Sequence, residues 1–426
     1  MSVKLARKST QLSPTEQNYC GIGDFLILLR EKFPLYHIIM QSNITNACQR
    51  PRYELLDGLR GVAAVMVIWY HFFEGFATSS VDQMMNHGYL AVDFFFVLSG
   101  FVIGYAYDGR MRPRGRMTGR GFMLRRVIRL HPMVVLAVVL GALSFIIQGC
   151  EQWDGSRVPI GMVLVALLLG MFLIPVLPGM AAEVRGNGEM FPLNGPSWSL
   201  FFEYIGSILY AVALHRASKQ TLAWVTAISG IALAVCSMTN LSGAYHIGFG
   251  WSTGPDGLGL LGGFLRLSFS FSAGLLMQRC FRPRRIRGAF WLCAAIVCAV
   301  MACPYVGGDE PSVLNAVYDS AATLLVFPAV VYIGACGTTT DRFSTASCDF
   351  LGRLSYPVYI IHYPVMYLFY SWVWTNGLSF SDVWPVCIGL FVLIIAMAWG
   401  AMKFYDEPVR KWLTARFIQR KSAPGC

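Results

Sequence analysis

Long apolar segments follow one another through most of the chain after Tyr53. Each contains close to the ~20 residues that a helix needs to cross the hydrocarbon core of a bilayer. Of the 426 residues, 55% are hydrophobic and only 13% are charged, whereas about a quarter of the residues in soluble proteins are charged. The sequence therefore predicts an all-α, polytopic transmembrane helical bundle of about ten to eleven helices. The apolar windows are 55–77, 87–107, 127–148, 158–178, 197–214, 220–238, 257–278, 288–304, 315–336, 352–375 and 382–405.

Three regions can be distinguished along the chain. Residues 53–410 contain all of these windows and are predicted to form one membrane domain. Residues 1–52 precede it as an N-terminal extension, which we expect to be interfacial or disordered because its apolar stretch 25–40 is interrupted by the charged residues 30–32. Residues 411–426 are predicted to be a basic cytoplasmic tail.

The number of crossings poses a parity problem. Both termini are basic and therefore favour the cytoplasm, which requires an even number of crossings. Counting from each end places the basic loops 110–129 and 279–287 on the cytoplasmic side, but the two counts disagree between residues 127 and 178. One of the windows 127–148 and 158–178 is therefore expected to re-enter the membrane instead of crossing it. We expect a multi-pass protein of the plasma membrane, which would be the cell inner membrane in a bacterium.

The formal net charge of +11 does not indicate a nucleic-acid partner. Most basic residues lie in short loops between the apolar windows, as the positive-inside rule produces, so the lipid bilayer is the partner that the charge predicts. The twelve cysteines are scattered, without a CxxC motif or a Cys/His ligand spacing. We therefore expect buried apolar cysteines and no metal site.

The first window carries two ionisable residues, Arg60 and His71, on one helical face. They are eleven residues apart, and at about 100° per residue this spacing returns to nearly the same face, roughly 16 Å along the axis. Glu74 lies one turn beyond His71. Ionisable groups in hydrocarbon are costly and are by default candidates for function. The alternative is that Arg60 only extends to the lipid headgroups and that His71 is a hydrogen-bonded core residue.

Three further windows contain isolated polar groups at a similar apparent depth. Asp93 requires a cation or a histidine nearby, because a carboxylate buried without a partner costs several kcal/mol. Glu203 and His362 can each be structural, but their depth is what a shared polar pocket would require. Ser99 follows Asp93 by six residues and is also compatible with close helix packing.

Arginines cluster where the third window begins. Arg126 and Arg129 lie on one helical face, and Arg125 is adjacent to them. Guanidinium groups bind phosphate oxygens well, so these arginines are candidates for a phosphate site. They can equally be anchors at the lipid headgroups. The sequence contains neither a GxxxxGKS loop nor a GxGxxG turn as a competing nucleotide motif.

Five sequence blocks, in this order, resemble those of the acyltransferase 3 family, whose members are integral membrane enzymes that modify mostly carbohydrate hydroxyls. The resemblance covers roughly residues 53 to 410. The blocks are "LDGLRGVAAVMVIWYH", "GYLAVDFFFVLSGFVIG", "RRVIRL", "PSWSLFFEY" and "LGRLSYPVYIIHYP".

The resemblance implies a membrane O-acyltransferase that uses acyl-CoA as a co-substrate, usually acetyl-CoA, and a carbohydrate or glycolipid as acceptor. His71 is expected to be the general base, because a neutral imidazole can accept the proton of an attacking hydroxyl. Glu74, Asp93 or Glu203 is expected to orient it. The donor is assigned to Arg60, Arg125, Arg126 and Arg129, and substrate contacts are assigned to Ser99, Trp198, Ser199 and His362.

A proton-coupled transporter or a flippase of a polar or lipid-linked substrate is the alternative. Its proton relay would also place His, Asp and Glu side chains at depth. Many transporters are built from related halves, and no sequence repeat at a fixed period is evident here. The acceptor and the length of the acyl chain stay open at this point.

Overall fold

Helices form the regular secondary structure of the chain in the computed structural model, which describes residues 53–111, 115, 117–241, 243, 246–254, 257–308, 310–339 and 341–419. These residues contain no β-sheet, only three isolated bridges. The extension expected at residues 1–52 and the last residues of the basic tail, 420–426, lie outside this part of the chain.

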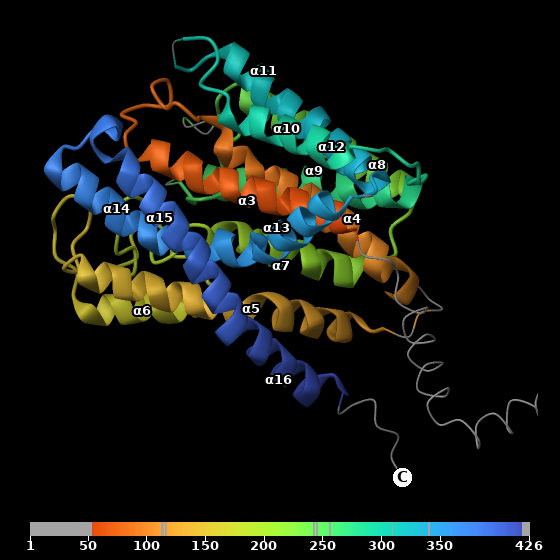
Figure 1. Cartoon of the computed structure of the whole chain (residues 1–426), viewed down its shortest axis with the longest axis horizontal. Coiled ribbons are helices and arrows are strands. Elements are labelled where there is room, and N and C mark those ends of the chain that lie inside the picture. Colours follow the sequence, from red (N-terminus) through yellow and green to blue (C-terminus); the bar gives the residue numbers. More distant parts are fainter. Residues whose placement is uncertain are drawn as a thin grey trace, which may run out of the picture. The chain divides into compact units, whose positions relative to one another are not determined.

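The helices follow the apolar windows closely (Figure 1). Eight helices in the described residues are long and apolar enough to cross a membrane, which confirms the predicted all-α membrane bundle. The elements in chain order are α3 (Glu54–Glu74), η1 (His87–Leu90), α4 (Ala91–Met111), α5 (Gly119–Ile147), α6 (Ile160–Met171), α7 (Ser197–Leu209), η2 (Tyr210–Leu214), α8 (Lys219–Met238), α9 (Leu258–Cys280), α10 (Ala289–Ala302), α11 (Val313–Ala321), η3 (Ala322–Val326), α12 (Phe327–Cys336), α13 (Arg342–Ile361), α14 (Tyr363–Asn376), α15 (Phe380–Ala401), η4 (Met402–Asp406) and α16 (Glu407–Phe417).

The parity problem has a structural counterpart in α6. This helix has 12 residues, about 18 Å at 1.5 Å per residue, which is short of the ~30 Å hydrocarbon core. The chain then returns to the end at which α6 began. The evidence is a hydrogen bond between residues on either side of α6, in which the amide of Trp153 donates to the carbonyl of Arg185 at 3.1 Å. Residues 158–178 therefore have the geometry of a re-entrant segment, and α5 with 29 residues has the length to cross.

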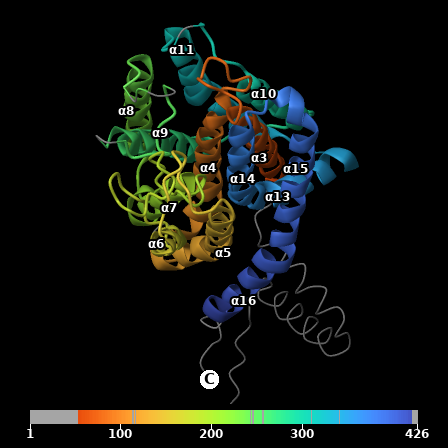
Figure 2. The ribbon, with the colours of Figure 1, turned by 90° about the vertical axis from the view of Figure 1, so that its left-hand side faces the viewer.

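Helix α3 lies in the core of the bundle and packs most extensively against α13 (Figure 2). Glycine makes this contact close: a methyl group at Gly61 would lie 2.3 Å from the carbonyl oxygen of Leu351. Helices α4 and α9 form a second close pair, in which a methyl group at Gly100 would lie 2.1 Å from the carbonyl oxygen of Phe271. Small residues at helix interfaces are typical of membrane proteins, because they let the backbones approach.

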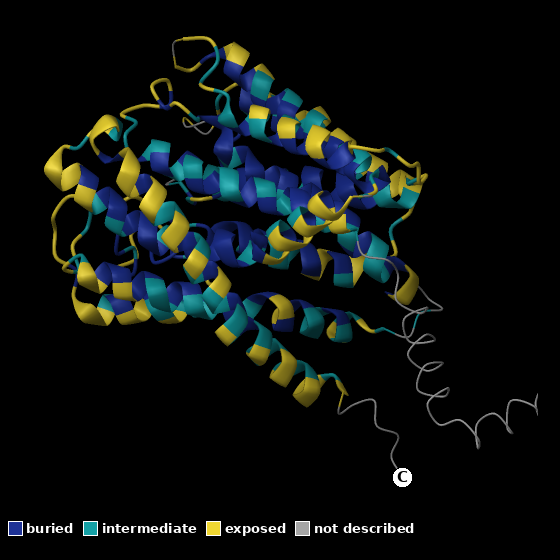
Figure 3. Ribbon diagram, in the orientation of Figure 1, coloured by how far each residue is buried: buried dark blue, intermediate teal, exposed yellow. Residues whose placement is uncertain are grey.

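Many residues of the outer helices are exposed (Figure 3), and large apolar residues are common among them, as contact with lipid requires. Helix α15 buries only Val383, Cys387, Ile394 and Ala398 among its 22 residues. Helix α8 exposes a row of large apolar residues that includes Trp224.

A proline separates α13 from α14. Pro364 has no amide hydrogen to donate to the carbonyl four residues earlier, so the helix is interrupted at His362. The imidazole Nδ1 of His362 instead lies 2.8 Å from the carbonyl oxygen of Tyr359. This break turns α14 so that Tyr363, Tyr367 and two further aromatic residues face a cavity.

Candidate active site

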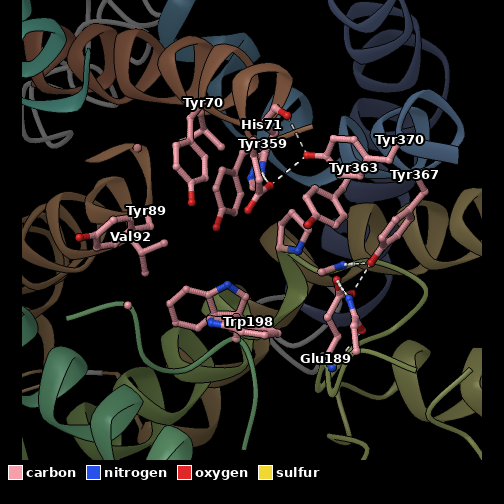
Figure 4. A pocket seen from close by; sticks show the side chains of 18 of the residues that line it. Tyr70, His71, Tyr89, Val92, Glu189, Trp198, Tyr359, Tyr363, Tyr367 and Tyr370 are labelled. Atoms are coloured by element: carbon pink, nitrogen blue, oxygen red, sulfur yellow. Dashed lines mark hydrogen bonds and ion pairs between the residues drawn. The ribbon is translucent and has the colours of Figure 1, made fainter. Parts of the chain in front are cut away.

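A cavity of about 310 Å³ lies beside the C-terminal half of α3 and is lined mainly by aromatic residues. Figure 4 shows that Tyr70, Tyr359 and Tyr363 lie on one side of it and that Trp198 and Glu189 lie on the other. We call this the larger cavity. Its aromatic lining residues are Tyr70, Tyr89, Trp153, Trp198, Trp251, Tyr359, Tyr363, Tyr367, Tyr370 and Trp374.

His71 and Glu74 form a hydrogen-bonded pair in the wall of this cavity. His71 Nδ1 lies 2.6 Å from Glu74 Oε2, which also accepts a bond from the Tyr370 hydroxyl at 3.0 Å. A carboxylate at Nδ1 fixes the neutral imidazole in the tautomer with its hydrogen on Nδ1, which leaves Nε2 unprotonated. His71 can therefore accept a proton at Nε2, and Glu74 can stabilise the resulting imidazolium.

Two rings hold the imidazole of His71 in place. His362 stacks on it with 5.3 Å between centroids, and Tyr363 meets it edge to face at 4.8 Å. His362 is fully buried and does not line the cavity. Its Nε2 has no hydrogen-bond partner within the part of the chain that the structure describes. His362 is therefore stacked on the ring of His71 and does not border the cavity itself.

Glu189 supplies a second carboxylate to the larger cavity from the irregular segment between α6 and α7. It accepts hydrogen bonds from the Tyr367 hydroxyl and, at 2.9 Å, from the Asn187 amide. Burial raises the pKa of Glu189 to about 7. Arg185, whose guanidinium lies 3.6 Å from the centroid of the Tyr367 ring, supports this arrangement from behind.

A second cavity of about 100 Å³ lies beside the N-terminal half of α3, and we call it the smaller cavity. Arg60, Arg126 and Arg129 line it. Arg60 is committed to α13, because its Nε donates to Ser355 Oγ at 2.8 Å. The helical face predicted to carry Arg60 and His71 therefore borders both cavities, with Arg60 at the smaller and His71 at the larger.

Arg126 is buried and paired with Glu203. One guanidinium nitrogen contacts Glu203 Oε1, and Nε donates to Ser207 Oγ at 3.2 Å. Ser99 donates to the same carboxylate oxygen at 3.2 Å. Three of the predicted site residues, Ser99, Arg126 and Glu203, thus form one polar cluster in the wall of the smaller cavity.

Arg129 differs from Arg126 in having an exposed side chain with free donors. Neither a hydrogen bond nor an ion pair joins it to another residue that the structure describes. The cations Arg60, Arg126 and Arg410 and the anion Asp57 are near enough to act on it electrostatically. A guanidinium with five free donors in a cluster of cations is suited to an anion. Arg125, the neighbour of Arg126 in sequence, does not line either cavity.

Asp93 has the cationic partner that its burial requires. Arg266 of α9 contacts it with both Nε and Nη2, the shortest distance being 2.7 Å, and both side chains are almost fully buried. Arg266 also lies over the Trp198 ring and lines the larger cavity, whereas Asp93 does not. Asp93 is therefore separated from the cavity and contacts a residue that lines it, Arg266.

The structure thus distributes the residues singled out in the sequence over two places. His71, Glu74 and Trp198 line the larger cavity, and Arg60, Ser99, Arg126, Arg129, Ser199 and Glu203 line the smaller one. His71, Asp93, Glu203 and His362 do not share one pocket, contrary to what their positions in the apolar windows suggested. The described residues contain no group of three or more His, Cys, Asp or Glu side chains that could hold a metal.

Several lining residues had no place in the sequence interpretation. The stripe Tyr363, Tyr367, Tyr370 and Trp374 has helical spacing and could have been recognised as one face. Arg266 could have been found as an arginine inside an apolar window. Glu189 lies in an irregular segment without periodicity, so the sequence carried no signal for it.

Several curated proteins are similar to parts of the chain or to most of it. Over 195 residues it is 35% identical to "Protein 2 in picA locus" of Rhizobium radiobacter, a match that covers 44% of this chain and 95% of that protein. Over 374 residues it is 24% identical to a "Putative O-acetyltransferase" of Staphylococcus aureus (strain COL), which covers 84% of this chain. The chain spans 57% of the length of that relative.

A further relative is the "Putative membrane-bound transacylase BcsY" of Komagataeibacter xylinus, 25% identical over 316 residues and matched over 72% of each chain. No solved structure matches the chain. Residues 53–402 match the family described as an acyltransferase domain, and this range includes all five motifs. The chain is therefore a multi-pass membrane protein that belongs to the acyltransferase 3 family.

Proposed function

We propose that this enzyme transfers an acyl group, in the first place acetyl, from cytoplasmic acyl-CoA to a hydroxyl of a carbohydrate or glycolipid, with His71 as general base. One observation carries the proposal: a single face of α3 borders an arginine-lined cavity at one end and the His71–Glu74 pair at the other. The arginines at one end can bind a polyanionic donor, and the His71–Glu74 pair at the other end can deprotonate a hydroxyl acceptor.

The distribution of basic residues supports an orientation with the smaller cavity toward the cytoplasm. Arg110 lies in the last turn of α4, Arg120 in the first turn of α5 and Arg279 in the last turn of α9. Positive charges collect on the cytoplasmic side of membrane proteins. The Arg60 end of α3 would then face the cytoplasm of a cell whose plasma membrane holds the enzyme, and the His71 end would face outward.

The donor phosphates would bind beside Arg129. Its free guanidinium can take a phosphate bidentately, while Arg126 is already paired with Glu203. Arg60 and Arg126 would add positive potential to the site without direct contact. From there the pantetheine arm would extend along α3 and bring the thioester toward His71, which lies roughly 16 Å from Arg60 along the helix axis.

The larger cavity suits a sugar acceptor. Aromatic rings offer flat apolar surfaces for the C–H faces of a sugar ring, and Glu189 and Asn187 offer acceptors and donors for its hydroxyls. The carboxylate of Glu74 lies beside the base, His71. The acceptor hydroxyl would be held within reach of His71 Nε2.

The transfer would then proceed as a direct displacement at the thioester carbonyl. His71 Nε2 takes the proton of the acceptor hydroxyl as its oxygen bonds to the carbonyl carbon. The carbon–sulfur bond breaks, and the CoA thiolate receives the proton from the imidazolium. Glu74 stabilises the imidazolium in between, as the carboxylate does in acyl-transfer triads. The products are an ester and CoA.

The test uses the purified full-length protein in lipid nanodiscs with acetyl-CoA and a panel of glycans. CoA release that depends on a glycan, together with an acetylated glycan identified by mass spectrometry, is the expected result. A protein that binds glycans but releases no CoA with any donor contradicts the proposal and favours a transport role.

A further inference from the structure

Tyr359 lies at the boundary between the larger and the smaller cavity. In the described part of the chain its side chain alone lines both. It projects from the last turns of α13 and is only 8% exposed. The sequence motifs assign it no role, and in the larger cavity it is one of several aromatic lining residues.

Two contacts hold the ring of Tyr359 in this position. Its hydroxyl oxygen lies 2.8 Å from Ser199 Oγ of α7, and its ring meets Phe95 of α4 edge to face, with 5.3 Å between centroids. Ser199 donates its own hydrogen to the carbonyl oxygen of Pro196 at 3.0 Å, so the Tyr359 hydroxyl is the donor in the Tyr–Ser bond. A single neutral hydrogen bond therefore fastens the ring to α7.

The position of Tyr359 bears directly on the path of the donor. In the proposed function the donor phosphates bind beside Arg129 in the smaller cavity, and the thioester reacts beside His71 in the larger one. An acyl group that enters from the smaller cavity must pass the ring of Tyr359. A two-carbon group needs little displacement of the ring, whereas a branched or aromatic group needs the bond to Ser199 broken and the ring turned aside.

We propose that Tyr359, fastened by Ser199, closes the passage between the two cavities and limits the bulk of the acyl group that reaches His71. The inference rests on the proposed function and names its specificity-determining residue. Among the described residues, neither a hydrogen bond nor a ring contact joins Tyr359 to His71 or Glu74. It therefore selects among donors and is not a catalytic residue.

The experiment compares acetyl-CoA, isobutyryl-CoA and benzoyl-CoA as donors for purified full-length variants with one glycan acceptor. Tyr359→Ala should raise the ratio of kcat/KM for benzoyl-CoA to that for acetyl-CoA about tenfold or more, the scale at which one steric group discriminates between substrates. Tyr359→Phe and Ser199→Ala keep the ring and should raise the ratio only about two- to threefold. Combining the last two should add nothing further, because both remove the same bond.

Tyr332→Ala is the matched control, because Tyr332 on α12 lines neither cavity. It should leave the donor ratio unchanged. A general loosening of the bundle would lower the rate for all donors together and leave the ratio as it was. Calorimetric binding of benzoyl-CoA without acceptor gives a readout that needs no turnover, and Tyr359→Ala should tighten it while leaving the affinity for free CoA unaltered.

Unchanged donor ratios and affinities in a Tyr359→Ala protein that still transfers acetyl would overturn the role of Tyr359 and leave the acyltransferase function standing. If that protein does not fold, unchanged ratios in both Tyr359→Phe and Ser199→Ala overturn the role instead. Failure of the wild type to transfer an acyl group from any donor overturns both proposals.

Discussion

His71 Nδ1 lies 2.6 Å from Glu74 Oε2, one helical turn further along α3. This contact fixes the tautomer of the imidazole, and the bond from the Tyr370 hydroxyl to the same carboxylate oxygen fixes the carboxylate. The pair therefore combines a proton acceptor with a group that stabilises its charged form, and both border the larger cavity.

Glu74→Gln should lower kcat by about one to two decades, less than the roughly two to four decades expected for loss of a general base. The amide can still contact Nδ1 but cannot stabilise the imidazolium as a carboxylate does. Steady-state CoA release with a glycan acceptor measures the effect. Glu151→Gln, at an exposed loop residue, serves as the control and should behave as wild type. If Glu74→Gln is more damaging than His71→Ala, the assigned roles are reversed.

Arg129→Ala should raise the donor KM by about tenfold with a smaller effect on the acceptor KM, because one charge-assisted phosphate contact is lost. Arg129→Lys should restore only part of the affinity, since it keeps the charge but loses the bidentate geometry. Raising the salt concentration should weaken donor binding in the wild type more than in Arg129→Ala. Arg120→Ala, an exposed position on the same helix, is the control. An unchanged donor KM in correctly inserted Arg129→Ala and Arg129→Lys would remove Arg129 from the donor site.

Asp93→Asn should destabilise the protein by about 3–5 kcal/mol, because it leaves Arg266 as a buried cation without a counter-charge. Replacing the two residues together by Asp93→Leu and Arg266→Met should cost less than Asp93→Asn alone. Thermal unfolding in detergent, followed by size-exclusion chromatography, measures both. Asp349→Asn is the matched control, because Asp349 is exposed and its surface ion pair with Arg353, at 3.9 Å, contributes little to stability. Full stability of Asp93→Asn combined with complete loss of acyl transfer would show that Asp93 acts in the chemistry.

Glu189 should make the stability of the protein depend on pH. Its pKa is about 7 in the folded protein and about 4.5 in the unfolded chain, so the unfolded state releases the proton first as the pH rises. The contribution of Glu189 to the unfolding free energy is then lost between about pH 4.5 and pH 7, a loss on the order of 3 kcal/mol. Glu189→Gln keeps an acceptor for Tyr367 without the titration. The difference in melting temperature between about pH 5 and pH 8 should therefore be smaller in this variant.

Glu151→Gln serves again as the control for this pH comparison, because Glu151 lies in an exposed loop. An equal pH dependence in wild type and Glu189→Gln would show that Glu189 is ionised at all these pH values. The pKa of Glu189 would then be the same in the folded protein as in the unfolded chain.

Much of this architecture could be predicted from the sequence, because the length of an apolar segment and the helical period are local properties. The apolar windows predicted the helices, and the spacing of Arg60 and His71 identified the face of α3 that borders both cavities. The parity of the crossings also pointed to residues 127–178. Whether α5 or α6 was short could not be decided, because the length of α6 is set by the return of residues 172–196 along it.

Pairings between residues that are distant in the chain could not be predicted from the sequence. Asp93 visibly needed a cation, but its partner Arg266 is 173 positions away and had no feature that linked the two. Depth alone suggested one pocket for His71 and Glu203. The lateral arrangement of α3, α5 and α7 instead places Glu203 beside Arg126, on the other side of Tyr359 from His71. Packing between helices decides such relationships.

The most direct test of the account is the rate of glycan-dependent CoA release by His71→Ala protein whose membrane insertion matches that of the wild type. His131→Ala is the matched control, because this histidine on α5 lines neither cavity. We expect His71→Ala to lose roughly two to four decades in kcat while acyl-CoA binding is retained and His131→Ala stays near wild type. Near-normal turnover of His71→Ala would contradict it.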